Sequence, residues 1–181
     1  MRQVYHQSDA DYGGRITVPV LYDKRERRIV NNESAEILRI LNGAFQSSAE
    51  RPDIDLFPAD LRPQVDEINA WVYTAINNGV YKCGFARSQA AYDDAATGLF
   101  DGLERAEALL TQRDWLSGPR FTEADVRLFT TLVRFDIVYH THFKCNVKRL
   151  ADYPELWDYA RAIYQHPAVR HTTDFTHIKQ H

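Results

Sequence analysis

The chain has 181 residues, of which 44% are hydrophobic and 26% charged, enough to bury roughly 70% of the unfolded surface in one domain or two small ones. The net charge is −3, from 22 Lys and Arg against 25 Asp and Glu, and no basic block or aromatic-basic stripe occurs, which argues against nucleic acid as a partner. No apolar run approaches the ~20 residues of a membrane helix, and the polar start at residues 1–12 lacks the apolar core of a signal peptide, so we expect a globular cytoplasmic protein.

The first predicted elements are a β-hairpin and a helix. ITVPVLY (residues 16–22) is β-branched and apolar, a charged turn covers residues 23–27, and a second short apolar piece follows at residues 28–30. Asn31 and Asn32 are both good helix caps, and Ile37, Leu38 and Leu41 then follow at helical spacing. The sequence therefore predicts a hairpin followed by a helix over residues 33–41.

Everything after the proline-containing stretch at residues 47–58 is predicted to be helical. Apolar residues recur at steps of three and four over residues 61–77 and 88–112. Thr122 and Asp125 form a capping box for a helix that runs to about Tyr139, and Pro154 opens a last helix that His166-Pro167 ends. The predicted fold is mainly α, with a helical bundle preceded by the hairpin and its helix.

One constellation suggests a ligand site near the start of the chain. Pro19 interrupts a predicted strand, where a proline belongs at an edge, a bulge or a cis bend that presents the preceding backbone of Val18 to a ligand. Glu33 and Ser34 lie at a helix start, where free amides favour an anion. Such a site can hold an amino acid zwitterion, with Ser34 at the carboxylate and Glu33 at the ammonium. The alternative is an edge-strand proline and an ordinary acidic first turn.

Longer motifs then resemble a known family. VPVLYDK (18–24) and IVNNESAEILRILN (29–42) are similar to the end of the thioredoxin-like domain of glutathione transferases. Seven further segments resemble the glutathionyl-hydroquinone reductase (Xi-class) branch of that superfamily: NNGVYK (77–82), GFA (84–86), LFTTLVRFD (128–136), VY (138–139), HFKCN (142–146), ADYP (151–154) and FTHIK (175–179). The likeness covers residues 12–181.

The resemblance implies both an architecture and a reaction. Residues 1–46 would be part of a thioredoxin-like glutathione-binding domain, residues 47–58 a linker, and residues 59–181 the all-helical C-terminal domain. The parent reaction is glutathione-dependent reduction of glutathionyl-hydroquinones, with glutathione as co-substrate, a quinol-type small molecule as partner and no metal. A homodimer is expected by the same analogy.

The resemblance also implies residue roles. Val18 would pair through its backbone with the cysteinyl part of glutathione, Pro19 would be the cis-proline, and Glu33 with Ser34 would bind the γ-glutamyl group. Tyr81 and Tyr139 match tyrosines that face the quinol, where a phenol can donate a hydrogen bond to the departing hydroquinone oxygen. For each tyrosine the alternative is a half-buried phenol satisfied by the backbone.

The sequence differs from the family pattern at the catalytic nucleophile. A Cys-Pro-Trp-Ala motif near the start of the thioredoxin-like domain supplies the thiolate in the family, and the present sequence contains no such motif. Cys83 and Cys145 each follow a lysine but lie far apart in the sequence and outside any CxxC, so we expect reduced, buried thiols rather than substitutes or a disulfide framework. His140, His142 and Cys145 offer three zinc-type ligands without a fourth, and we expect no metal there.

Two functional hypotheses remain open. The chain is either an enzyme family member that is catalytically incomplete as given, or a non-catalytic module that binds glutathione or a partner protein through an exposed sheet edge.

Overall fold

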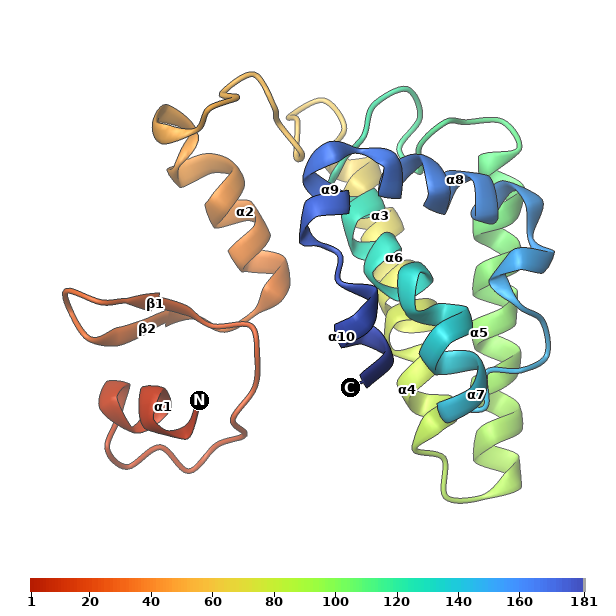
Figure 1. Cartoon of the computed structure of the whole chain (residues 1–181), viewed down its shortest axis with the longest axis horizontal. Helices are drawn as coiled ribbons and strands as arrows, with labels where there is room; N and C mark the ends of the chain where they lie inside the picture. The colour runs from red at the N-terminus through yellow and green to blue at the C-terminus, as the bar shows by residue number, and fades with distance from the viewer. Residues whose placement is uncertain (181) are drawn as a thin grey trace. The chain divides into compact units, whose positions relative to one another are not determined.

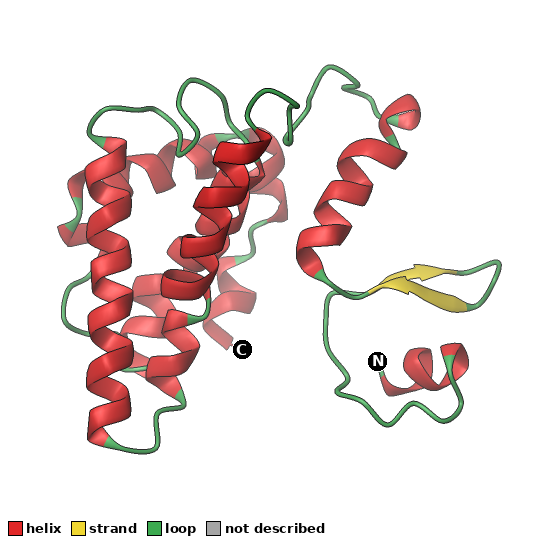
Figure 2. Cartoon of the chain, turned by 180° about the vertical axis from the view of Figure 1, so that it is seen from behind, coloured by secondary structure: helices red, strands yellow, loops and turns green. Residues whose placement is uncertain are grey.

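A computed structural model describes residues 1–180 and divides the chain into two compact units. The N-terminal unit comprises Met1–Phe57, and the helical unit comprises Pro58–His181. Figure 1 labels the elements along the chain, and Figure 2 shows that strands occur in the N-terminal unit while the rest is helix and loop. Each unit is described by itself.

The N-terminal unit contains a short two-stranded antiparallel sheet flanked by helices. Strand β1 (Leu21–Asp23) pairs with β2 (Arg28–Asn31), with Tyr22 opposite Ile29. Helix α1 (Arg2–Ser8) precedes the sheet, and α2 (Ser34–Ala44) with a 3₁₀ turn η1 (Gln46–Ser48) follows it. The mainly helical class and the hairpin-and-helix start that the sequence predicts are confirmed.

Two details of this unit differ from the predictions. The first strand covers residues 21–23 rather than 16–22, because Pro19 has no amide hydrogen with which to continue a ladder. Helix α1 was not predicted, since its seven residues hold few apolar side chains. It is held by the sheet, where the Ser8 hydroxyl accepts a hydrogen bond of 2.7 Å from the Ile29 amide, and Figure 1 shows α1 beside the hairpin.

The helical unit contains the predicted helices, two of which change their winding near the end. The α-helices are α3 (Arg62–Trp71), α4 (Gly79–Gly84), α5 (Gln89–Leu110), α6 (Glu123–Arg134), α7 (His140–His142), α8 (Pro154–Gln165), α9 (Pro167–Thr172) and α10 (Phe175–Gln180). A π-helical segment η2 (Val72–Asn77) follows α3, and another, η3 (Phe135–Tyr139), follows α6. Periodicity predicts each pair as one helix, because a single turn of wider winding carries no residue signal of its own. Such segments are frequent at functional sites.

A buried carboxylate organises the core of the helical unit. Asp125, in the predicted capping box at the start of α6, accepts hydrogen bonds from the Thr122 and Leu116 amides at 2.7 and 2.9 Å and from the Tyr159 hydroxyl at 2.8 Å. Burial raises the pKa of Asp125 despite these donors. The core of the unit also contains fully buried apolar side chains of α3, η2, α5, α6, η3 and α8, among them Val65, Ile76, Leu99, Leu103, Leu128, Leu132, Phe135 and Leu156. No helix among residues 1–180 is both long and apolar enough to cross a bilayer.

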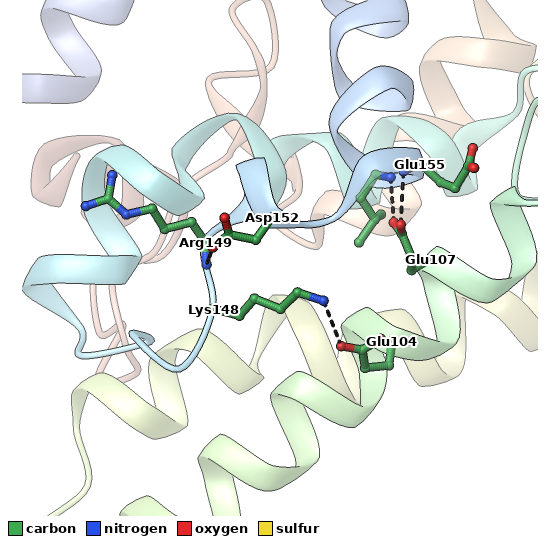
Figure 3. Close-up of polar contacts among 7 residues, drawn as sticks. Glu104, Glu107, Lys148, Arg149, Asp152 and Glu155 are labelled. Atoms are coloured by element: carbon green, nitrogen blue, oxygen red, sulfur yellow. Dashed lines mark hydrogen bonds and ion pairs between the residues drawn. The ribbon is translucent and has the colours of Figure 1, made fainter.

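Carboxylates of the bundle also anchor the loop between α7 and α8, as Figure 3 shows for residues of α5. Glu107 accepts hydrogen bonds from the Glu155 and Leu156 amides at 3.0 and 2.8 Å, so it caps the start of α8 from a neighbouring helix. Glu104 pairs with Lys148 at 3.2 Å. Asp136 accepts from the Leu150 amide at 2.6 Å and so caps the 3₁₀ turn η4 (Leu150–Asp152). These contacts hold the segment that follows Tyr139 in place.

Candidate functional site

The first group of predicted residues lies in the N-terminal unit and is called here the amino-terminal site: Val18, Pro19, Glu33 and Ser34. The Val18–Pro19 peptide bond is cis, and both residues precede β1 on an exposed loop. Glu33 is the N-cap of α2 and Ser34 its first residue, and both are exposed. The Asn31 side chain accepts a hydrogen bond of 2.7 Å from the Glu33 amide, so the turn before α2 is fixed while the helix start faces outward.

Tyr5 of α1 joins the two parts of the amino-terminal site. Its hydroxyl donates to the Thr17 carbonyl at 3.0 Å and accepts from the Asn32 side-chain amide at 3.2 Å. Thr17 immediately precedes Val18, and Asn32 immediately precedes Glu33. Tyr5 is 2% exposed, so one buried phenol holds both loops of the site. Sequence reasoning missed it because a lone tyrosine in a short polar segment carries no periodic signal.

The second group of predicted residues, the tyrosine pair Tyr81 and Tyr139, meets in the helical unit. Tyr81 lies on α4 and Tyr139 ends η3; their hydroxyl oxygens are 3.5 Å apart and their rings meet edge to face at 5.9 Å. Tyr81 is 46% exposed whereas Tyr139 is 6% exposed. Burial, and then the hydrogen bond with Tyr81, raise the pKa of Tyr139, so its phenol stays protonated and available as a donor.

Two phenylalanines complete an aromatic cluster, defined as Tyr81, Phe85, Tyr139 and Phe143. Phe143 lies with its ring centroid 5.3 Å from each tyrosine ring and 5.5 Å from Phe85. Phe85 is 71% exposed, so the cluster runs from a buried phenol to an open apolar edge. An open set of rings of this kind suits a flat aromatic ligand. Phe85 lies in the motif GFA and Phe143 in the motif HFKCN, but neither phenylalanine is assigned a role by the sequence.

The fit of α4 against Phe143 depends on a glycine. A Cβ atom on Gly84 would lie 2.6 Å from the Phe143 ring, well inside contact distance. The α4 backbone and the Phe143 side chain therefore touch directly, which brings Tyr81 and Tyr139 within reach of each other.

Comparisons with known proteins agree with this arrangement. A family model described as glutathione S-transferase, C-terminal domain, matches residues 89–162. Glutathionyl-hydroquinone reductase PcpF of Sphingobium chlorophenolicum is 53% identical over 99% of this chain and 57% of its own length. Glutathionyl-hydroquinone reductase YqjG of Escherichia coli is 50% identical over 99% of this chain and 54% of its own length. The chain belongs to the glutathione transferase superfamily.

Solved structures of superfamily members match across both units. The glutathione-bound structure of E. coli YqjG is 50% identical, with a TM-score of 0.95 over 98% of this chain and 57% of that one. Glutathione transferase Xi from Phanerochaete chrysosporium is 49% identical, with a TM-score of 0.95 over 99% of this chain and 59% of that one. The chain thus has Xi-class and glutathionyl-hydroquinone reductase homologues at about half identity, and it spans a little over half of the length of the curated relatives PcpF and YqjG.

The remaining predicted candidates of this glutathione transferase homologue lie in the helical unit, the two cysteines inside it and His142 at its surface. Cys83 and Cys145 are both free and buried, as expected. The Cys145 sulfur turns toward the Val80 carbonyl at 3.9 Å, whereas His142 is exposed. Within residues 1–180, no group of three or more His, Cys, Asp or Glu side chains is placed to hold a metal ion.

Proposed function

We propose that this chain binds glutathione and glutathionyl-hydroquinones and supplies the binding groups of a glutathionyl-hydroquinone reductase. The observation that carries the proposal is the tyrosine pair, in which a buried protonated phenol and a half-exposed one converge within an open aromatic cluster. The relatives named glutathionyl-hydroquinone reductase support the reaction class.

The amino-terminal site would hold glutathione. In this proposal the Val18 backbone pairs with the cysteinyl part, and the exposed Glu33 carboxylate and Ser34 hydroxyl bind the γ-glutamyl ammonium and carboxylate. An exposed helix start favours that carboxylate, because its first amides have no partner within the helix. The glutathione-bound structure among the superfamily relatives supports the ligand.

The tyrosine pair would hold the quinol. Tyr139 donates its hydroxyl hydrogen to the oxygen of the departing hydroquinone, where negative charge develops when the carbon–sulfur bond breaks. Tyr81 holds Tyr139 by the hydroxyl contact, and Phe85 with Phe143 covers the ring of the ligand. Cys83 and Cys145 are buried and neither is followed by Pro-Trp-Ala, so we expect residues 1–181 to bind both ligands without turnover.

The test is binding of glutathione and of a glutathionyl-hydroquinone by calorimetry, with hydroquinone release followed by chromatography. Ser34→Ala should weaken the binding of both ligands about fivefold, because one hydrogen bond contributes about 1 kcal/mol. Tyr139→Phe should weaken the binding of the glutathionyl-hydroquinone alone. Tyr73→Phe, at a tyrosine 52% exposed on η2, is the matched control and should change neither. A purified chain that binds neither ligand would rule the proposal out.

A second candidate function, a non-catalytic module that associates with a protein or a second copy, is favoured by apolar exposure on the N-terminal unit. Val18, Val30, Leu41 and Phe45 are each at least 50% exposed, and β2 is an edge strand in the sheet described. Light scattering over a range of concentrations should show a homodimer that Val30→Lys weakens. A monomer at every concentration would count against self-association.

A further inference from the structure

The end of helix α7 turns through a residue in an unfavourable backbone conformation. Phe143 is the C-cap of α7, and Lys144, the residue after it, has a φ of 60°, in the left-handed region. Glycine usually takes this position at a helix end, because the Cβ atom of any other residue crowds a carbonyl oxygen there. A lysine stays in this conformation only where other contacts hold the turn.

Two contacts close the turn from within its own segment. The Phe143 and Cys145 amides both donate to the Tyr139 carbonyl, at 3.2 and 3.0 Å. Cys145 is fully buried, and its thiol donates to the Val80 carbonyl of α4 at 3.9 Å. The turn is therefore tied to the end of η3 on one side and to α4 on the other.

A further contact reaches the strained residue itself from a neighbouring helix. The Tyr92 hydroxyl, in the first turn of α5, donates to the Lys144 carbonyl at 2.6 Å, and the Asn146 side-chain oxygen lies 3.5 Å from the same hydroxyl. The Ser88 side chain caps α5 by accepting a hydrogen bond from the Ala91 amide at 3.2 Å. Tyr92 thus stands on an ordered helix start and holds the turn from outside.

The turn at Lys144 confines the Phe143 ring within the aromatic cluster. The Phe143 ring centroid is 5.3 Å from each ring of the tyrosine pair, and the ring touches the α4 backbone at Gly84. If Lys144 relaxed to a negative φ, the Cys145 amide would leave the Tyr139 carbonyl. The last turn of α7 would then lose one of the two hydrogen bonds that close it, and the ring would no longer be fixed against the tyrosines.

We propose that Tyr92 is a positioning residue of the aromatic cluster: its hydroxyl holds the strained turn at Lys144, and this turn holds Phe143 against the tyrosine pair. Tyr92 would not touch the quinol. Because the rings are ordered before the ligand enters, binding does not have to order them. The inference rests on the proposed function for the identity of the ligand, whereas the order of Phe143 can be measured without any ligand.

Calorimetric titration of the purified chain and its variants tests the effect on binding. Tyr92→Phe should weaken the binding of a glutathionyl-hydroquinone by about two- to fivefold, because fewer chains hold an ordered cluster and at most one hydrogen bond is lost. The affinity for glutathione alone should not change. Tyr73→Phe, on η2 of the same unit, is the matched control and should change neither affinity.

A second substitution separates positioning from a general loss of stability. Glycine adopts the left-handed region without strain, so Lys144→Gly added to Tyr92→Phe should restore the affinity for the glutathionyl-hydroquinone. Arg27→Gly is the matched control, because Arg27, in the turn of the β-hairpin, is the other non-glycine residue at positive φ (55°) among residues 1–180. It should restore nothing. A double variant with Lys144→Gly that binds as weakly as Tyr92→Phe alone would overturn the proposal.

Nuclear magnetic resonance of the chain with isotope-labelled phenylalanine follows the order of Phe143 directly. The two tyrosine rings should displace the Phe143 ring resonances, which Phe143→Leu assigns. In Tyr92→Phe these resonances should move toward their values in the unfolded chain, and Lys144→Gly should bring them back. Resonances that stay in place in Tyr92→Phe would show that Tyr92 does not order the cluster.

The outcomes separate this inference from the proposed function. If the unmutated chain binds no glutathionyl-hydroquinone, the proposed function fails, and the Phe143 resonances still decide whether Tyr92 orders the cluster. If the unmutated chain and Tyr92→Phe bind that ligand equally well, the proposed function stands and this inference fails.

A variant pair at Lys144 keeps the test open if Tyr92→Phe does not fold. Valine is β-branched and tolerates a positive φ poorly, so Lys144→Val should weaken the binding of the glutathionyl-hydroquinone with Tyr92 in place. Lys144→Gly should not weaken it. Equal affinities of these two variants would refute the role of the turn.

Discussion

The side-chain amide of Asn32 donates a hydrogen bond of 3.2 Å to the hydroxyl of Tyr5, a residue of the first helix. That contact ties the turn before Glu33 to the loop before Val18, since the same hydroxyl donates to the Thr17 carbonyl. The amino-terminal site is thus supported by a side chain that would not itself touch glutathione.

Tyr5→Phe should weaken glutathione binding about fivefold, because loss of one hydrogen bond of about 1 kcal/mol leaves the two loops less well ordered. Calorimetric titration with glutathione measures the effect. Tyr12→Phe is the matched control, since the Tyr12 hydroxyl donates only to the Arg15 carbonyl. Equal losses in both variants, or none in Tyr5→Phe, would remove Tyr5 from the support of the site.

Alkaline titration should reveal the link between the tyrosine pair. Free tyrosine has a pKa of about 10. Burial and the contact with Tyr81 raise the pKa of Tyr139, so Tyr81→Phe should lower the pKa of Tyr139 toward its ordinary value without fully restoring it. Absorbance of the tyrosinate at 295 nm, compared with Tyr81→Phe and with Tyr139→Phe, measures the shift. An unchanged late-titrating phenol in Tyr81→Phe would contradict the prediction.

The same shift fixes the sign of a stability effect. Because the folded pKa of Tyr139 lies above the unfolded one, the protonated phenol contributes stability that is fully present below pH about 10 and is lost as pH rises through the folded pKa. The free energy of unfolding should therefore fall less steeply above pH about 10 in Tyr139→Phe than in the unmutated chain. Denaturant titrations at pH 8 and in the alkaline range provide the comparison.

Gly84→Ala should destabilise the helical unit by about 1–3 kcal/mol, because the added methyl group overlaps the Phe143 ring near its attachment to the backbone. Gly98→Ala on α5 is the matched control: nothing lies within 4 Å of its added Cβ, so this variant should gain about 0.5–1 kcal/mol. Denaturant unfolding gives both values. The close packing of α4 on Phe143 would be refuted by two variants of equal stability.

Glu107→Ala should destabilise the helical unit by about 1 kcal/mol or more, because it leaves the first amides of α8 without their cap. Glu104→Ala, one turn earlier on α5, removes the exposed pair with Lys148 and should cost less than about 1 kcal/mol. Figure 3 shows both glutamates on α5, Glu104 next to Lys148 and Glu107 at the start of α8. Thermal unfolding of both variants compares them, and a larger loss for Glu104→Ala would contradict the assignment.

The sequence alone predicted the features that depend on local pattern. Apolar spacing predicted the longer helices of the bundle, α3, α5, α6 and α8, but not the short helices α4, α9 and α10. The Thr122 capping box was confirmed because Asp125 stands three residues further along. The family resemblance was confirmed by relatives of about half identity. The roles of Val18, Pro19, Glu33, Ser34, Tyr81 and Tyr139 stay predictions.

Only the tertiary structure decided which distant residues meet. The π-helical winding before Tyr139, the contact of Tyr5 with Asn32 and the contact of the Cys145 thiol with the Val80 carbonyl all depend on how segments far apart in the chain pack. Sequence spacing describes the face that a helix presents, because that follows from 3.6 residues per turn. Which segment packs against that face depends on how the side chains of the whole core fill its volume and satisfy its polar groups. Only the folded unit shows this packing.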